Sequence, residues 1–124
     1  MGYRTVDTDD LELAPDRPCD LRRISEAAGL EGMAVNRFSA EPGEQLPLAY
    51  HYHEQQEELF YVLAGTLHVE TPDEEFVIDA DGVFACDPES PQRAFNPADA
   101  DAAVEVLAVG VPPVDGDAVP YEGE

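Results

Sequence analysis

Short apolar runs, each ended by proline, glycine or aspartate, dominate the chain and constrain its fold most. Apolar and polar residues alternate within most of these runs, as they do in β-strands that bury one face. The runs recur about every 8–12 residues, which is the spacing of a β-sandwich or a closed β-barrel. No amphipathic stretch is long enough for a structural helix, which argues against α/β architectures. The sequence therefore predicts an all-β protein of about eight strands, at residues 33–38, 48–53, 59–63, 66–70, 76–78, 83–86, 93–95 and 103–109.

The length of 124 residues suits a single domain. We expect three parts in chain order, which are an N-terminal arm with a first edge strand (1–32), a β-barrel (33–111) and an acidic C-terminal tail (112–124). One short helical turn is expected from Ile24, with Ser25 as its cap and Gly29 as its stop. The tail is either a loose end or an arm laid on a partner subunit, and a loose end is the simpler interpretation.

The charge of the chain is strongly one-sided. The sequence has 28 acidic residues, six Arg and no Lys, which gives a formal net charge of −22. Such a surface repels itself at low salt, whereas molar salt screens the repulsion because the Debye length falls to about 3 Å. The composition resembles that of proteins from halophilic archaea and predicts loss of structure at low salt; an ordinary acidic protein is the alternative.

The same charge limits the classes of partner. Binding to nucleic acid or to an anionic membrane needs clustered cations, and these are missing, so we expect neither partner. No apolar run approaches the roughly 18 residues of a membrane span. The first residues show no basic start followed by an apolar stretch, so we expect no secretory signal and a cytoplasmic location. Cys19 and Cys86 form no Cys-x-x-Cys pair and are expected to be free thiols without a catalytic role.

His51-Tyr52-His53 is the first feature with a chemical implication. Residues i and i+2 of a strand share a face, so two imidazoles about 7 Å apart along the strand can converge on one ion. Glu58 follows after a polar stretch that is expected to turn, so it can open the next strand and face the same interior. Two His and one carboxylate make a facial triad that leaves coordination positions free.

The spacing of these residues resembles the first motif of the cupin superfamily. Gly43 precedes His51-x-His53, four residues separate His53 from Glu58, and six residues separate Glu58 from Gly65. The segment Glu57-Glu58-Leu59-Phe60-Tyr61-Val62-Leu63-Ala64-Gly65 is especially close to the usual wording of that family. The resemblance implies a double-stranded β-helix, or jelly-roll barrel, with a metal held by His51, His53, Glu58 and a further His from a second motif. It also suggests a homodimer, because cupins commonly pair through their sheets.

The second motif departs from the family pattern. Asp81-Gly82 and the segment 88–97 align with it, but Gln92 stands where the family has its further His. Gln92 can ligate a metal through its amide oxygen, or bind a metal-bound water or a substrate, or the site has lost its metal. We expect His51, His53, Glu58 and Gln92 to form the metal site. No thiolate selects among metals, so a divalent Fe, Mn, Ni, Co, Cu or Zn ion fits equally well.

Three other polar residues have simpler interpretations. His68 is expected to be an ordinary strand residue, and Asn96 to shape the turn before Pro97. Arg93 is expected to pair with local acids rather than bind an anionic substrate.

Two functions remain open at this level. The first is a metal-dependent enzyme on a small molecule, dioxygenase-like or isomerase-like, although no general base is evident beyond the ligands and no catalytic residue is assigned. The second is a non-catalytic small-molecule binding or sensing barrel that has lost a full metal site.

Overall fold

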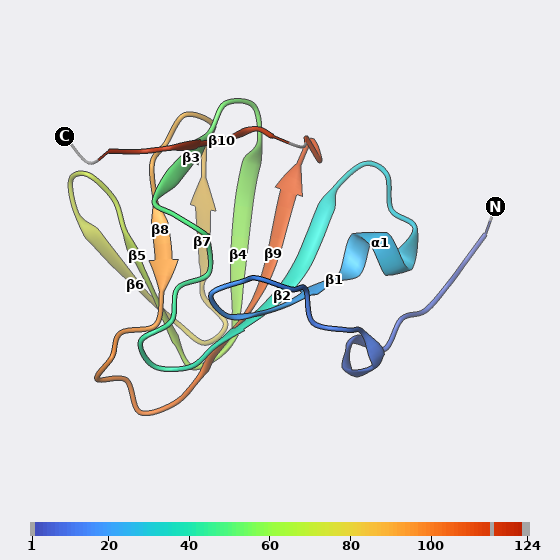
Figure 1. Cartoon of the computed structure of the whole chain (residues 1–124), viewed down its shortest axis with the longest axis horizontal. Coiled ribbons are helices and arrows are strands. Elements are labelled where there is room, and N and C mark those ends of the chain that lie inside the picture. Colours follow the sequence, from blue (N-terminus) through green and yellow to red (C-terminus); the bar gives the residue numbers. More distant parts are fainter. Residues whose placement is uncertain (1, 115, 123–124) are drawn as a thin grey trace.

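A computed structural model describes residues 2–114 and 116–122 of the chain (Figure 1). The described residues form ten strands, one short 3-10 helix and one short α-helix. In chain order the elements are η1 (Thr8–Asp10), β1 (Asp20–Arg23), α1 (Ile24–Ala28), β2 (Ala34–Ala40), β3 (His51–His53), β4 (Glu57–Ala64), β5 (Thr66–Glu70), β6 (Glu75–Asp79), β7 (Val83–Cys86), β8 (Arg93–Phe95), β9 (Val104–Val111) and β10 (Ala118–Pro120).

The strands form antiparallel sheets that enclose one interior. The largest sheet has the order β1-β2-β9-β4-β7, a second has the order β6-β5-β8, and β10 pairs with β3. In Figure 1 the β6-β5-β8 sheet lies beside β7 and β4, and β10 runs across one end of the barrel with β3. The all-β fold class, predicted from the spacing of the apolar runs, and the jelly-roll barrel, implied by the resemblance to cupins, are confirmed.

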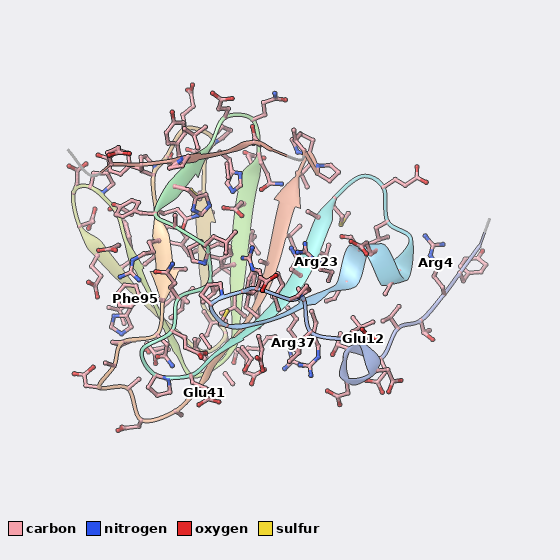
Figure 2. All side chains as sticks on the ribbon, in the orientation of Figure 1. Arg4, Glu12, Arg23, Arg37, Glu41 and Phe95 are labelled. Carbon is pink, nitrogen blue, oxygen red and sulfur yellow. The ribbon has the colours of Figure 1, made fainter. Side chains whose placement is uncertain are left out.

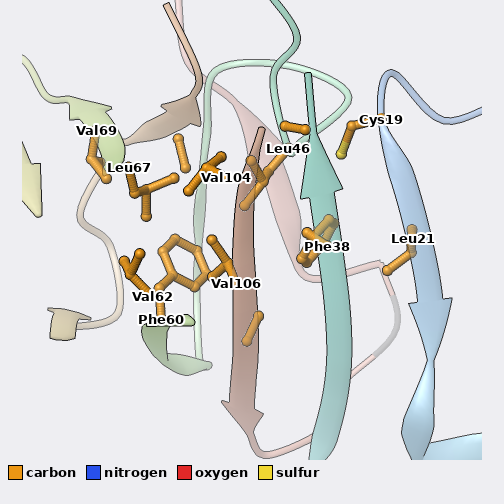
Figure 3. Close-up of a cluster of buried hydrophobic side chains, with 13 residues drawn as sticks. Cys19, Leu21, Phe38, Leu46, Phe60, Val62, Leu67, Val69, Val104 and Val106 are labelled. Atoms are coloured by element: carbon orange, nitrogen blue, oxygen red, sulfur yellow. The ribbon is translucent and has the colours of Figure 1, made fainter. Parts of the chain in front are cut away.

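The core follows from strict alternation along the strands. Inward residues of β9 are buried at every second position, as Val104 and Val106 show, while the intervening residues are only partly buried. β4 and β5 supply Phe60, Val62 and Leu67 to the same cluster (Figure 3). Each fully buried aliphatic side chain contributes about 1.5–3 kcal/mol relative to an exposed one, so this cluster stabilises the barrel.

The turn from β4 to β5 requires glycine. Gly65 has a φ of 78°, and a Cβ there would lie 2.5 Å from the carbonyl oxygen of Ala103. Any larger residue would meet both backbone strain and a clash. The glycine that ends the first cupin-like motif therefore has a structural reason.

Three local predictions are corrected. The expected strand at 48–53 is limited to His51–His53, because the Gln45 side chain binds the carbonyl oxygens of Pro47 and Leu48 and holds that stretch as a loop. Gly29 does end the helical turn, with a φ of 68°. Ser25, however, is not its cap.

The cap position of α1 is Arg23, which makes no capping hydrogen bond with its side chain. The Ser25 hydroxyl instead donates to the carbonyl of Met33 and accepts from the Val35 N–H, tying the helix to β2. The third correction concerns the tail, because residues 118–120 pair as β10 with β3 of the same chain and are not a loose end.

The N-terminal segment is not wholly a surface arm, because its last part packs into the barrel. Cys19 and Leu21 belong to the buried core. Among the described residues, no helix is long and apolar enough to cross a membrane.

Candidate metal centre

A pocket of about 420 Å³ opens at the end of the barrel that β3 and β10 cross. Its walls come from the inner faces of β1, β2, β9 and β4, from the loop before β3, and from the segment before β8. His51, His53, Glu58 and Gln92 all line it. The fold thus brings all four predicted site residues together.

Backbone pairing on both edges of β3 positions the two histidines. On one edge, His51 and Gln92 exchange hydrogen bonds between their backbone groups, with N···O distances of 3.3 and 2.8 Å. On the other edge, β10 places Pro120 opposite His51 and Ala118 opposite His53. Pairing on both edges fixes the direction of the two imidazoles.

The two imidazoles converge as the i, i+2 spacing predicts. The Nε2 atoms of His51 and His53 lie 3.2 Å apart, and the rings meet edge to face with their centroids 4.8 Å apart. His51 Nδ1 lies 2.8 Å from the carbonyl oxygen of Ala49, which can only accept, so this contact places the proton on Nδ1. The Nε2 lone pair of His51 is then free to face the pocket.

Glu58 completes the cluster from the neighbouring strand. One of its oxygens, Oε1, lies 3.5 Å from His53 Nε2. The same oxygen accepts a hydrogen bond of 3.0 Å from Nε2 of Gln92. Gln92 is 2% exposed, and its own Oε1 is buried without a hydrogen-bond partner. Gln92 therefore stands beside Glu58 as a donor, and its interpretation as a direct metal ligand stays a prediction.

Burial governs the protonation of this cluster. It lowers the pKa of both His51 and His53, with a smaller lowering of the His53 pKa by the adjacent His51. Burial also raises the pKa of Glu58 to about 7, against the opposing effect of the hydrogen bond from Gln92. Without an ion, the close contact between His53 and Glu58 therefore joins a mostly neutral imidazole and a carboxyl group that is only partly ionised at neutral pH.

The ligand atoms are spaced as a metal ion requires. One nitrogen from each His and one oxygen of Glu58 lie within 4.8 Å of one another. Metal–ligand bonds of about 2.0–2.2 Å place neighbouring ligand atoms roughly 3–3.5 Å apart, and the distances of 3.2 and 3.5 Å agree with this. Neutral imidazoles are the form that binds metal. The residues present therefore fit a divalent transition metal.

Asp117 supports the site from the C-terminal tail, and the sequence analysis missed it. Its carboxylate is buried and accepts the backbone N–H groups of Glu54, Gln55 and Gln56 at 3.1–3.2 Å. Burial opposes ionisation of Asp117, but these hydrogen bonds outweigh it and hold the pKa below its usual range. Oδ2 also lies 3.6 Å from His53 Nδ1, which is beyond hydrogen-bond distance, and this Nδ1 has no hydrogen-bond partner among the described residues. The Asp117 carboxylate therefore places a negative charge behind the imidazole, the position from which carboxylates orient metal-binding histidines.

The simpler interpretations of the other polar residues hold. His68 lies on β5, where its Nδ1 is 2.8 Å from Glu75 Oε2, away from the cluster. Arg93 pairs with Glu70 and lies over the ring of Phe95.

Asn96 is buried and donates to the carbonyls of Ala40 and Ala102, so it anchors the loop after β8. Cys19 and Cys86 are free, and burial raises the pKa of each thiol to about 11. A pKa this high disfavours the thiolate of either residue at neutral pH.

Residues 36–110 match the family model of the cupin domain. The chain belongs to the cupin family. This match covers the barrel from β2 to β9 and includes every member of the His51, His53, Glu58 and Gln92 cluster.

Similar proteins include two whose names refer to polyketides and one that is described as a sugar phosphate isomerase. A stretch of 87 residues is 34% identical to the protein named polyketide synthase CurC of Streptomyces cyaneus, covering 65% of this chain and 53% of that protein, so the match spans about half of that curated relative. A cupin structure from Silicibacter pomeroyi described as a sugar phosphate isomerase has a TM-score of 0.73 and 25% identity, over 87% of this chain and 75% of that one. The polyketide cyclase RemF of Streptomyces resistomycificus has a TM-score of 0.73 and 20% identity, over 98% and 92% of the two chains, and shows the shared fold.

Proposed function

We propose that this cupin is a metal-dependent enzyme that binds a small molecule in the barrel pocket and rearranges it without net oxidation, as isomerases do. The observation that carries the proposal is the convergence of His51 Nε2, His53 Nε2 and Glu58 Oε1 on the pocket at the spacing of metal ligands. A divalent Fe, Mn, Ni, Co, Cu or Zn ion bound there would supply Lewis acidity toward an oxygen atom of the ligand.

The residues of the chain would have separate tasks around that ion. His51 and His53 would hold it, with the Ala49 carbonyl and Asp117 orienting their rings. Gln92 would keep Glu58 directed into the pocket through its N–H donor. The apolar walls would exclude water from the bound molecule.

Dioxygenase-like chemistry uses the same kind of open site, because a three-residue ligand set leaves positions for dioxygen. We favour isomerase-like chemistry because the Silicibacter pomeroyi relative described as a sugar phosphate isomerase reaches 25% identity over most of this chain. Deuterium exchange tests this preference. In D2O, an isomerase acting on a carbonyl compound would introduce deuterium at the neighbouring carbon, under nitrogen as well as in air.

Metal content is the first test of the proposal. We expect protein purified without chelator or a His-tag to hold near-stoichiometric Fe, Mn, Ni, Co, Cu or Zn by elemental analysis. His51→Ala and His53→Ala should each lose the metal, since two ligands are too few to retain it. His68→Ala is the matched control, because His68 lies on β5 with Glu75 and should leave the metal content unchanged. Equal metal content in all four proteins would overturn the proposal.

Substitution of Gln92 separates its possible roles. Gln92→His restores the stronger imidazole donor at a position that lies directly opposite His51, and we expect tighter metal binding in a chelator competition. Equal or weaker affinity would mean that Gln92 acts only on Glu58.

A non-catalytic binding barrel is the second candidate, because a buried glutamine stands where the cupin family has a further His. In that case a small molecule would bind equally well to the metal-free protein and to the metal-loaded protein. Calorimetric titration of both forms distinguishes the candidates.

We also propose that two copies associate through the outer face of the large sheet. Leu59 and Leu63 of β4 and Val83 of β7 are 38, 41 and 48% exposed on that face. Adjacent exposed apolar side chains favour burial against a partner. Light scattering should give the mass of a dimer for the wild type and that of a monomer for Leu63→Asp.

A further inference from the structure

The pocket has a charge unlike that of the rest of the molecule. The chain has 28 acidic residues, yet Glu58 is the one acidic residue among the described residues that line the pocket. Two of the six arginines, Arg17 and Arg23, line it as well. The pocket of this strongly anionic protein is therefore lined by two cations, and both lie outside the barrel segment that matches the cupin family.

Arg17 lies just before β1, with its guanidinium partly satisfied. One nitrogen, Nη2, donates to the carbonyl of Leu46 at 3.1 Å, which holds the side chain against the pocket wall. Its Nε is buried and has no hydrogen-bond partner. Within residues 2–114 and 116–122, no carboxylate forms an ion pair with it. A buried donor without an acceptor is costly, and a ligand can supply the missing acceptor.

Arg23 enters the pocket from the end of β1. It shares a strand face with the buried Leu21, and its backbone partner across the sheet is Asn36, which also lines the pocket. Figure 2 shows Arg23 beside β2, on the side of the barrel formed by the large sheet. Arg22 belongs to the opposite face of β1, where its Nε donates to the carbonyl of Leu11.

The remaining arginines lie outside the pocket. Arg37 and Arg93 are each paired with a glutamate on a neighbouring strand, Glu105 and Glu70. Arg4 and Arg22 donate to backbone carbonyl oxygens. Arg17 and Arg23 instead line the same pocket, and within residues 2–114 and 116–122 neither forms an ion pair with a carboxylate. Burial lowers the pKa of Arg17, and the charge of Arg23 lowers it further. Two cations that line one pocket without a carboxylate paired to either form a suitable site for an anion.

We propose that Arg17 and Arg23 form a subsite for an anionic oxygen group, a carboxylate or a phosphate, carried by the small molecule that occupies the pocket. The inference rests on the proposed function, because the same pocket would hold the rest of that molecule against His51, His53 and Glu58. Guanidinium groups suit this task, since their N–H donors match the oxygens of carboxylate and phosphate. The subsite names the substrate class as small organic acids or phosphate esters.

Anion binding to the full chain tests the subsite directly. The protein is treated with chelator, so that no metal binds the anion, and is kept in potassium chloride at constant ionic strength. Inorganic phosphate and acetate are then titrated separately by calorimetry, with thermal unfolding as a second readout. We expect saturable binding of at least one of the two anions and a rise in the melting temperature.

Three variants decide the location. Arg17→Gln and Arg23→Gln should each weaken anion binding about tenfold or more, as expected for loss of a charged hydrogen bond. Arg22→Gln removes the same charge from the other face of β1 and should change affinity less than twofold. Arg23 is exposed, so its variant remains informative if Arg17→Gln fails to fold.

Each outcome has a definite meaning. Saturation by phosphate alone, acetate alone or both supports the subsite and identifies the group that it takes. No saturable binding of either anion, or equal weakening in Arg22→Gln, would overturn it. Metal content is measured separately on protein that has not been treated with chelator. A protein that binds phosphate through Arg17 but holds no metal would therefore retain the subsite and lose the metal-dependent function.

Discussion

The two ends of the barrel interior are built from the same strands and differ in what those strands direct inward. On β4, Val62 is fully buried at the closed end, while Glu58 faces the pocket from the same side of the strand at the open end. On β9, Val104 is fully buried at the closed end, and the smaller Ala108 lines the pocket at the open end. One end is filled with aliphatic side chains and the other leaves space and polar groups.

This difference shows how the barrel separates stability from chemistry. The closed end excludes water and gains the favourable free energy of apolar burial. The open end buries Glu58 and Gln92, which costs stability unless their polar atoms are satisfied. The closed end therefore offsets the cost of the site, and substitutions at the two ends should change stability in opposite directions.

The largest expected effect is at the closed end. Leu67 is fully buried, and Leu67→Ala should lower the free energy of unfolding by about 2–5 kcal/mol because it leaves a cavity. Leu13→Ala is the control, because Leu13 lies in the segment before β1, away from the proposed dimer face, and is 46% exposed. Denaturant titration at high salt measures both. A cost for Leu13→Ala equal to that of Leu67→Ala would contradict the assignment of stability to the closed end.

The opposite sign is expected at the open end, in chelator-treated protein. The pKa of Glu58 is raised to about 7 in the folded state from 4.5, so the unfolded chain ionises first as pH rises. The free energy of unfolding therefore falls by about 3 kcal/mol between pH 4.5 and 7 on account of this group. Glu58→Gln does not titrate, so its stability relative to wild type should rise across that window.

Denaturant titrations of wild type and Glu58→Gln at pH 4.5 and pH 8 measure this difference in the free energy of unfolding. The contributions of the other acidic residues largely cancel, because these residues are the same in both proteins. We expect Glu58→Gln to bind metal poorly at both pH values. A stability difference that does not change with pH would show that Glu58 is not buried as a protonated acid.

A smaller effect is expected from the tail that closes the open end. Asp117→Asn keeps one acceptor for the N–H groups of residues 54–56 but loses the charge behind His53. We expect metal affinity to fall about 10–100-fold, the usual effect of removing a partner behind a metal ligand. Chelator competition measures it. Asp81→Asn, whose side chain bonds the Tyr61 hydroxyl outside the pocket, should leave affinity unchanged.

Much of the fold could be predicted from the sequence, because strand alternation and turn residues act locally. The turn at Gly65 and the inward rows of β5 and β9 follow directly from such patterns. The strand boundary before His51 and the role of Ser25 could not, since strand and helix propensities do not include the side-chain hydrogen bonds that decide them, from Gln45 to Pro47 and from Ser25 to Met33. The i, i+2 spacing of His51 and His53 likewise predicted their shared direction.

By itself, the sequence determined an all-β barrel and a His51, His53 and Glu58 cluster, because period-two alternation and short spacings set which side chains share a face. Only the tertiary structure decided what surrounds that cluster. Asp117 reaches it when β10 pairs with β3, and Arg17 and Arg23 reach the pocket when β1 pairs with β2. The first pairing joins residues 65–69 positions apart in the chain, and the second joins residues 13–19 positions apart. Local sequence patterns do not predict such pairings, because the pairings form only when the sheets close around a common interior.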